Sequence, residues 1–469
     1  IATSIQEHIV ADHPKHLNES QQKALQHIIS CNDVGIIHGP PGTGKTTTLV
    51  QAIAQTVKTE QQVLVCTPSN ASIDLLVEKL SEFGLNVVRI GHPARVTEQT
   101  LSKTLDAKIA AHPNFKELRM MRKKMEQLRN QASKYKRNFG YKEKEERRFL
   151  RQEANALKAD ADVLEFHIIN DILHKSDVIT CTLVGASHPT LRGKKYKTVF
   201  VDEAAQALEP ACWIPICRAE RVIFAGDHFQ LPPTIKSREA ANNGLAETLF
   251  EKCIKRHPEA ASMLQVQYRM HEDIMGFPSK YFYDDQLIAD PTIKNHQLPN
   301  QSPMRFIDTA GCGYNETLDP ETLSKYNEDE ARLLIHSLEQ LVDQIGQQEW
   351  IHAGYSIGII TPYSAQVAIL LGLAEETPQL NEIASLISIN TVDAFQGQER
   401  DVIAISLVRS NDSGEIGFLN DIRRTNVAIT RARKKVIIIG DSSTLYANPF
   451  YNELVEYVQN KNYYQSAFE

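Results

Sequence analysis

The stretch NVAITRARKKVIIIG, residues 426–440, places two arginines directly before an apolar run that is typical of a buried strand. A guanidinium donates several hydrogen bonds in a fixed plane, which suits the binding of an oxyanion. The first chemical question posed by this chain is therefore which anion Arg431 and Arg433 bind.

The segment GPPGTGKT, residues 39–46, follows the apolar run GIIH and precedes the helical pattern TTTLVQAIAQTV. It matches the GxxxxGK[ST] phosphate loop, in which backbone N–H groups at a helix N-terminus surround phosphates. Lys45 is expected to bridge the β and γ oxygens of a nucleotide, and the Thr46 hydroxyl to bind Mg²⁺. The predicted nucleotide-binding residues of this loop are Gly39, Pro40, Pro41, Gly42, Thr43, Gly44, Lys45, Thr46 and Thr47.

Two further polar groups follow apolar runs. KTVFVDEAAQ delivers Asp202 and Glu203 to the end of an expected strand. An isolated Asp-Glu pair is usually only solvated, but after a phosphate loop Asp202 is expected to hold Mg²⁺, usually through water, and Glu203 to orient the attacking water as general base. RVIFAGDHFQLPP repeats the pattern with Asp227 and Gln230, and Gln230 can sense the γ-phosphate.

These motifs require elements that hold them in place. Short β-branched runs alternate with amphipathic helical stretches, which indicates βα units around parallel sheets and an α/β fold. The ten candidate strands are GIIHG, QVLVCTP, DVITCT, KTVFVDEA, RVIFAGD, MRFIDT, SIGIITP, ISINTVD, DVIAISLV and KVIIIGD. Ten strands need more than one sheet, and 469 residues exceed what one core usually supports, so at least two domains are expected.

The composition excludes several classes of protein. The chain is 42% hydrophobic and 23% charged, and no window offers the roughly 18 uninterrupted apolar residues of a membrane span. Seven scattered cysteines without CxxC pairs argue against a disulfide framework or a zinc cluster. The chain begins with Ile1 and has no signal pattern, so we expect a fragment or processed chain in the cytoplasm, or in the nucleus if the source is eukaryotic.

The net charge of −7 is distributed unevenly. From Lys116 to Arg151 the chain has fourteen Lys or Arg against five Asp or Glu, with no proline and many helix formers. This window predicts a helical hairpin broken near Phe139 and Gly140. Two interpretations have equal weight: a solvated insertion whose charges keep it soluble, or a surface that contacts nucleic-acid phosphates.

The motifs GPPGTGKT, VDEAAQ, GDHFQLPP, QYRMH, TVDAFQGQE and NVAITRAR, in this order, resemble the motif set of superfamily 1 helicases. Their variants resemble the up-frameshift-like branch of subgroup B. RIGHPAR, EPACWIP, DTAGCG and VRSN are most similar to the immunoglobulin-mu-binding-protein helicases of that branch. The resemblance extends from Leu17 to Glu469. It implies two RecA-like domains, residues 1–264 with a basic helical insertion at about 100–170 and residues 265–469, with ATP between them and a single strand across both.

The resemblance also assigns individual residues. Gln21 and Tyr268 are expected to bind adenine, Arg269 the γ-phosphate, and Glu399 the ribose or the neighbouring network. Small hydroxyl and backbone donors after other strands should hold the phosphates and sugars of the single strand without reading bases. The expected strand-binding residues are Pro68, Ser69, Asn70, Thr182, Tyr363 and Thr391. A serine or threonine in such a place is, taken alone, more often a turn or cap residue.

The anion of Arg431 is then expected to be the γ-phosphate of ATP, and Arg433 to form a salt bridge or support it. The implied activity is a monomeric ATP-dependent 5′-to-3′ translocase or helicase on single-stranded RNA and DNA. The alternatives are an ATP-switched clamp or ribonucleoprotein remodeller without processive unwinding, and a signalling NTPase. Relatives carry a small β-barrel on a helical stalk, whereas about twenty residues precede the phosphate-loop domain here, so the barrel has been removed or is dispensable.

Overall fold

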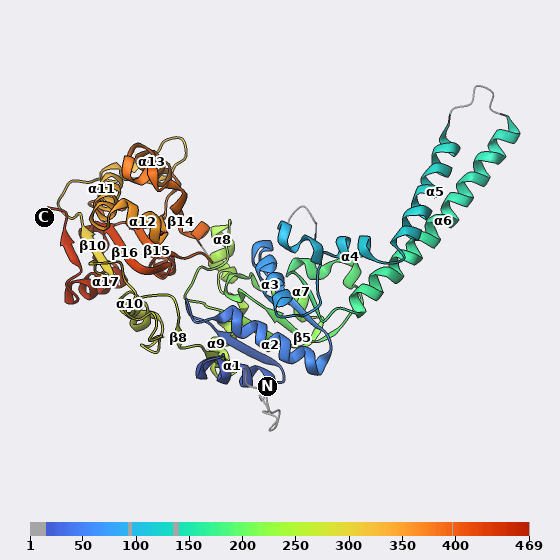
Figure 1. The fold of residues 1–469 in the computed structure, drawn as a ribbon, viewed down its shortest axis with the longest axis horizontal. Helices are drawn as coiled ribbons and strands as arrows, with labels where there is room; N and C mark the ends of the chain where they lie inside the picture. The colour runs from blue at the N-terminus through green and yellow to red at the C-terminus, as the bar shows by residue number, and fades with distance from the viewer. Residues whose placement is uncertain (1–15, 92–95, 135–139, 396, 469) are drawn as a thin grey trace.

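A computed structural model describes residues 16–91, 96–134, 140–395 and 397–468. The chain forms two α/β units, and a long helical hairpin projects from the first (Figure 1). Ile1, residues 92–95 of RIGHPAR and Phe139 lie outside the described residues, so the expectations placed on them are not addressed by the structure. Within the described chain, no helix is both long enough and apolar enough to cross a membrane.

In the described residues, the first unit contains a seven-stranded parallel sheet in the order β3-β4-β2-β5-β6-β1-β7. Its strands are β1 (Val34–His38), β2 (Val63–Thr67), β3 (Val87–Arg89), β4 (Val178–Thr182), β5 (Tyr196–Val201), β6 (Ala219–Gly226) and β7 (Ala261–Met263). Alternate residues of β2 enter different cores: Val63 and Val65 pack on one face, and Leu64 and Cys66 on the other. Both faces are covered, as a parallel sheet requires.

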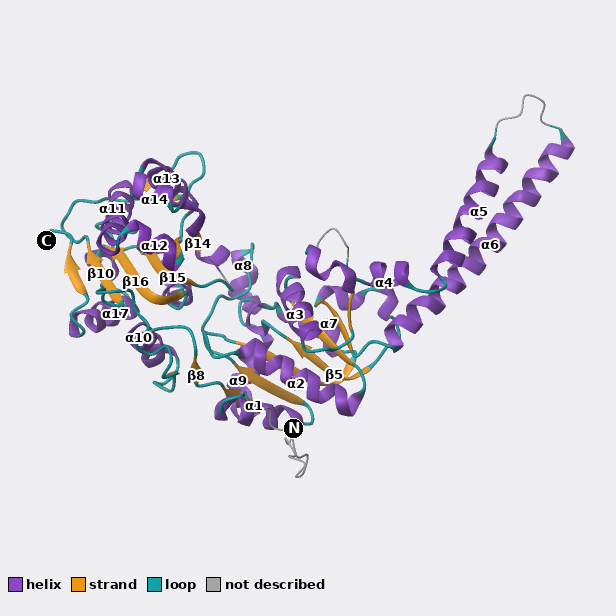
Figure 2. Cartoon of the chain, in the orientation of Figure 1, coloured by secondary structure: helices purple, strands orange, loops and turns teal. Residues whose placement is uncertain are grey.

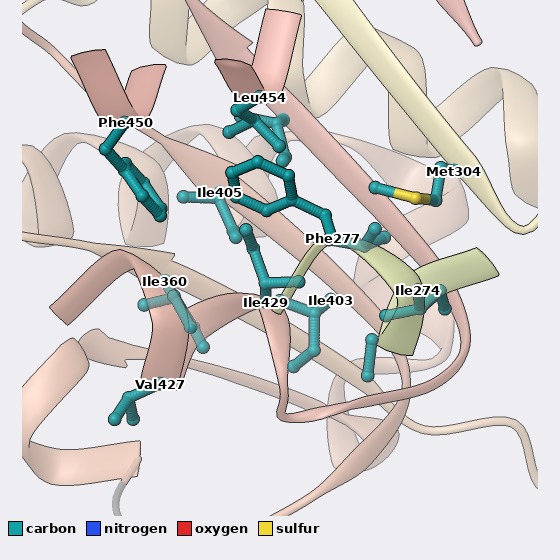
Figure 3. Packing of buried hydrophobic residues seen from close by; sticks show 14 of the residues in the cluster. Ile274, Phe277, Met304, Ile360, Ile403, Ile405, Val427, Ile429, Phe450 and Leu454 are labelled. Carbon is teal, nitrogen blue, oxygen red and sulfur yellow. The ribbon is translucent and has the colours of Figure 1, made fainter. Parts of the chain in front are cut away.

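The second unit contains, within the described residues, a six-stranded parallel sheet in the order β14-β13-β15-β16-β10-β17. Its strands are β10 (Met304–Asp308), β13 (Ile357–Thr361), β14 (Ile387–Thr391), β15 (Arg400–Ser406), β16 (Ala432–Gly440) and β17 (Tyr464–Ser466). Figure 3 shows one of its two cores, in which Phe277, Ile405 and Leu454 pack together. All ten strands predicted from β-branched runs are present, and the expected α/β fold with two RecA-like units is confirmed.

Helices cover the faces of both sheets (Figure 2). Those of the first unit are α1 (Glu19–Ser30), α2 (Lys45–Glu60), α3 (Asn70–Glu82), α7 (Glu209–Ile216), α8 (Arg238–Ala240) and α9 (Leu249–Arg256). Those of the second are α10 (Glu272–Phe282), α11 (Glu328–Ile345), α12 (Gln347–Ala353), α13 (Ser364–Glu376), α14 (Pro378–Glu382), α15 (Ile422–Ile429), α16 (Ser442–Leu445) and α17 (Pro449–Asn460). The described residues also contain two separate two-stranded sheets. They are β8 (Val266–Gln267) with β9 (Ile288–Ala289) and β11 (Thr317–Leu318) with β12 (Lys325–Tyr326).

The predicted helical hairpin is present as α5 (Phe115–Ser133) and α6 (Tyr141–His174), preceded by α4 (Leu105–Ala111). Leu118, Ile168 and Ile172 at its base are buried in the core of the first unit, whereas most of its length projects into solvent (Figure 1). Part of the basic charge is matched within the hairpin, since Arg122 Nη2 lies 2.5 Å from a carboxylate oxygen of Glu165.

Candidate nucleotide site between the two units

The phosphate loop connects β1 to α2, and its conformation requires glycine. Gly42 and Gly44 both have φ of +76°, a left-handed conformation that side chains with a Cβ rarely adopt. A Cβ on Gly42 would also lie 2.8 Å from the Cβ of Arg269, which belongs to the segment leading into the second unit. This position in the loop therefore requires glycine. The close approach of Arg269 also shows that the loop packs directly against the second unit.

Lys45 is the first residue of α2, and its ammonium is held by two carboxylates. Nζ lies 2.6 Å from Glu203 Oε1 and 3.4 Å from Asp202 Oδ1. Burial alone would lower the pKa of Lys45, but these carboxylates outweigh it and raise that pKa. Burial raises the pKa of the Asp202 carboxyl, and Lys45 opposes this rise. The three charged groups predicted from two separate motifs thus meet at the carboxyl ends of β1 and β5.

Arg431 reaches the same place from the second unit. Its side chain is buried, and it donates to the carbonyl oxygens of Val427 and Gln398 and, over 3.0 Å, to Gln230 Oε1. All three acceptors are uncharged. Burial lowers the pKa of Arg431 to about 9, and the nearby charge of Arg269 acts in the same direction. Arg431 is therefore a buried cation in a position where an anion would be favourable.

Arg269, Glu399 and Arg433 form an ion-pair network beside Arg431. Arg269 Nε donates over 2.5 Å to one oxygen of Glu399, and Arg433 pairs with the other oxygen. The expected salt bridge of Arg433 is thus confirmed. Of the two roles expected for Glu399, the structure supports a place in this network, because both carboxylate oxygens already accept from arginines.

The two residues expected at adenine differ in availability. Tyr268 is 44% exposed, and its hydroxyl accepts a 2.9 Å hydrogen bond from Asn18 Nδ2. Gln21 is buried; its Nε2 donates to the carbonyl of Thr43 and its Oε1 accepts from the Asn18 backbone N–H. Gln21 therefore supports the phosphate loop and the start of α1. Only the second hydrogen of its Nε2 and the second lone pair of its Oε1 remain available to bind a base.

A pocket of about 330 Å³, a size in the range of small-ligand sites, lies among these groups, although Gln21, Asp202 and Arg433 do not line it. It is lined by residues 39–47 together with Leu75, Glu203, Gln230, Tyr268, Arg269, Gly397, Glu399 and Arg431. Most of the residues predicted for nucleotide binding are thus brought together from both units. Leu75 and Gly397 were not predicted. Leu75 is an exposed leucine of α3, and only its exposure in the fold, not its residue type, marks it.

The expected strand-binding residues follow the carboxyl ends of β2, β4, β13 and β14, but their side chains are largely committed to local structure. Ser69 caps α3 by accepting from the Ser72 N–H, and Thr182 Oγ1 accepts from the Gly185 N–H. Asn70 accepts from Arg89 over 3.1 Å. Pro68 and Thr391 are partly exposed.

Tyr363 has a side chain that is only 4% exposed, and its hydroxyl accepts from Arg409 over 3.2 Å. The side chain is therefore engaged within the second unit, and the expected contact between this loop and the strand stays a prediction.

A phosphate loop and an acidic strand end in one parallel-sheet unit, facing arginines of a second, define a RecA-like P-loop nucleotide-binding protein. Two AAA-domain family models match residues 16–238 and 245–443. The chain is 39% identical to "DNA-binding protein SMUBP-2" of Mesocricetus auratus over 97% of its own length and 46% of the relative's. It is 35% identical to an uncharacterized ATP-dependent helicase of Methanocaldococcus jannaschii, with 95% and 71% covered.

A third relative, "Regulator of nonsense transcripts 1" of Dictyostelium discoideum, is 35% identical over 95% of this chain and 32% of its own. The chain belongs to the up-frameshift-like branch of the superfamily 1 helicases. It spans just under half the length of the SMUBP-2 proteins that it matches.

Proposed function

We propose that this chain is an ATP-dependent 5′-to-3′ translocase and helicase that acts on single-stranded RNA and DNA, with residues 1–264 and 265–469 as its two motor domains. The observation that carries the proposal is the pocket in which Lys45 and Glu203 of the first unit face Arg269 and Arg431 of the second. Relatives named as an ATP-dependent helicase and a DNA-binding protein support the same activity.

In the proposed reaction, the backbone of residues 42–46 and the Lys45 ammonium bind the phosphates of ATP. A phosphate oxygen competes with Glu203 for Lys45, since the two now share a 2.6 Å ion pair. Once released, the Glu203 carboxylate can orient water toward the γ-phosphate as general base. Glu203 has φ of +51°, a left-handed conformation that is uncommon for a residue with a side chain and is often associated with functional sites.

Thr46 and Asp202 are the proposed ligands of Mg²⁺. Both offer oxygen atoms, the donor type that this ion prefers, and both adjoin the Lys45 end of the pocket. When bound, the ion would neutralise charge on the β and γ phosphate oxygens. Asp202 is 5% exposed and its Oδ1 accepts from the Glu203 N–H, which fixes the carboxylate before any ligand binds.

Arg431 would stabilise the charge that develops on the transferred phosphoryl group. Its three uncharged partners hold the guanidinium in place, and the γ-phosphate would supply the missing negative charge. Because Arg431 and Arg269 belong to the second unit, hydrolysis becomes conditional on the relative position of the two units. This dependence would convert a chemical step into movement along a strand.

The single strand is proposed to cross the carboxyl ends of β2 and β4 in the first unit and of β13 and β14 in the second. Backbone groups and small side chains there suit phosphate and sugar contacts, which supports action on both RNA and DNA. We further propose a monomer working in a reducing compartment such as the cytoplasm, which is consistent with seven free cysteines. Gel filtration at micromolar concentration tests the monomer.

The function is tested by measuring ATP hydrolysis with and without single-stranded RNA or DNA, and strand displacement from 5′- and 3′-tailed duplexes. We expect stimulation by both polymers, because a strand spanning both units favours the closed pocket. Displacement should require a 5′ tail. Stimulated hydrolysis without displacement would favour the clamp or remodeller, and equal rates with and without polymer would favour a signalling NTPase.

A further inference from the structure

The loop after β6, residues 227–231, leaves the first unit and packs into the second. The Phe229 ring lies 5.6 Å from Phe282 and 5.4 Å, edge-on, from Tyr283, both at the end of α10. Asn426 Nδ2 of α15 donates over 2.8 Å to the Phe229 carbonyl, and Leu231 is buried in the core of the second unit. This loop is therefore a direct mechanical connection between the two units.

Asp227, the first residue of this loop, is a buried carboxylate with four hydrogen-bond donors. His38 Nε2 and the Phe229 N–H donate to Oδ1, both over 3.1 Å. Gln230 Nε2 and the Tyr283 hydroxyl donate to Oδ2, both over 2.8 Å. Burial alone would raise the pKa of Asp227, but the bonds from His38, Gln230 and Tyr283 hold that pKa below its ordinary value.

Three of these donors come from the first unit, and only Tyr283 comes from the second. Its hydroxyl stays protonated and can donate, because burial, with the nearby Asp227, raises the pKa of Tyr283 well above its ordinary value.

His38, Asp227 and His228 also have ligand atoms within 4.8 Å of one another, a grouping that could hold a cation. The four donors already satisfy both oxygens of Asp227, so the carboxylate needs no ion.

Asp227 also determines which end of the Gln230 amide faces the pocket. Since Nε2 donates to the carboxylate, Oε1 is turned to Arg431 Nη2, 3.0 Å away. The chain of contacts therefore runs from Tyr283 through Asp227 and Gln230 to Arg431. The two ends of this chain of contacts, Tyr283 and Arg431, belong to the second unit, whereas Asp227 and Gln230 belong to the first.

We infer that Tyr283 is a positioning residue for ATP hydrolysis: its hydroxyl fixes Asp227, and through Asp227 the Gln230 amide that holds Arg431 in place. The inference rests on the proposed ATPase function and adds a residue outside the motif set. The Tyr283–Asp227 and Arg431–Gln230 bonds both join the two units. The orientation of Gln230 therefore depends on a contact that the second unit supplies.

The test compares Tyr283→Phe with Tyr451→Phe in the full chain. Tyr451 is a matched control because it belongs to the same core and, among the described residues, its buried hydroxyl bonds to Thr425 and Leu419, both within the second unit. Tyr283→Phe removes a hydrogen bond to a charged carboxylate, which is stronger than a bond between neutral groups. We therefore expect this variant to lower strand-stimulated kcat about tenfold. The KM for ATP should change less than about twofold, because Tyr283 lies outside the pocket lining. Tyr451→Phe should keep the parental kcat.

A double-mutant cycle with Gln230→Ala shows whether Tyr283 acts through Gln230. If it does, Tyr283→Phe has little further effect on kcat in the Gln230→Ala background. Full additivity, a parental kcat in Tyr283→Phe, or an equal loss in Tyr451→Phe would each overturn the inference while leaving the proposed function intact. An unmodified chain that hydrolyses no ATP with any single strand would overturn the proposed function, and the inference with it.

Discussion

Replacement of Arg431 by alanine gives the sharpest test of the ATP-binding pocket. The guanidinium is held by three hydrogen bonds to uncharged acceptors, so it is positioned before nucleotide binds, and it has no close ion pair among the described residues. An arginine that stabilises a transferring phosphoryl group contributes roughly 10³ to 10⁵ in rate in other NTPases. We expect Arg431→Ala to lower strand-stimulated kcat by at least about 10³-fold, which corresponds to about 4 kcal/mol of transition-state stabilisation.

Nucleotide affinity should change much less, by about tenfold or under, because the phosphate loop and Lys45 remain. Lys45→Ala should impair both binding and hydrolysis, since it removes the ammonium and leaves Asp202 and Glu203 without their counter-charge. Binding of a fluorescent ATP analogue and steady-state turnover separate the two effects.

Arg433→Ala is the matched control, because this arginine is two residues away but pairs with Glu399 and has a side chain that is 42% exposed. It should retain kcat within about tenfold. Parental turnover in Arg431→Ala, or equal losses in the two variants, would refute the assignment of Arg431 to the γ-phosphate.

Three further predictions concern other parts of the chain. Replacing Arg122, Lys123 and Lys124 of α5 with glutamine should weaken strand affinity and flatten the plot of log K against log salt by at most roughly 0.7 per lost contact; unchanged slope and affinity would leave the hairpin a solvated insertion. Duplexes with only a 3′ tail should not be displaced, and efficient displacement of them would contradict the 5′-to-3′ direction. Burial raises the pKa of Glu330 to about 7, so its protonated form favours the folded state: this contribution is complete below the unfolded pKa near 4.5 and is lost as pH rises through 7, about 3 kcal/mol in total. Urea unfolding of Glu330→Gln at pH 5 and pH 8 should show a smaller loss of stability between these pH values than the parent, and an equal loss would exclude this group as the cause.

The strands that sequence patterns predicted have continuous β-branched runs, and all of them except the edge strand β14 lie inside the sheets. Within the two main sheets, the strands that were missed are β3, β7 and β17, which have three residues each and lie at sheet edges. The two-residue strands β8, β9, β11 and β12 outside these sheets were missed as well. An edge strand is defined mainly by its neighbour, because its own sequence is too short to show alternation. The fold class was therefore accessible from sequence, whereas the full strand order was not.

The candidate site divides in the same way. Lys45, Asp202 and Glu203 could be predicted because each belongs to a short motif whose chemistry needs those residue types at that spacing. The engagement of Gln21 by Thr43, the burial of Tyr363 beneath Arg409 and the bond from Tyr283 to Asp227 could not. These contacts join residues that are 22 to 56 positions apart. Tertiary packing selects them, and single residue types carry no signal for it.

The helical hairpin also has mechanical properties. With 34 residues, α6 is about 50 Å long, and its C-terminal end is fixed in the core of the first unit by Ile168, Ile172 and Leu173. Between Ile168 and Tyr141 the arm is about 40 Å long, so its far end moves by about 0.7 Å for each degree that its base turns. A long arm also reduces the force that a given torque at its base produces at its far end. The far end can therefore move far but can exert only a small force. A pair of fluorescent labels, one near Tyr141 and one on the second unit, would therefore report rotations of the first unit that are too small to detect at the pocket itself.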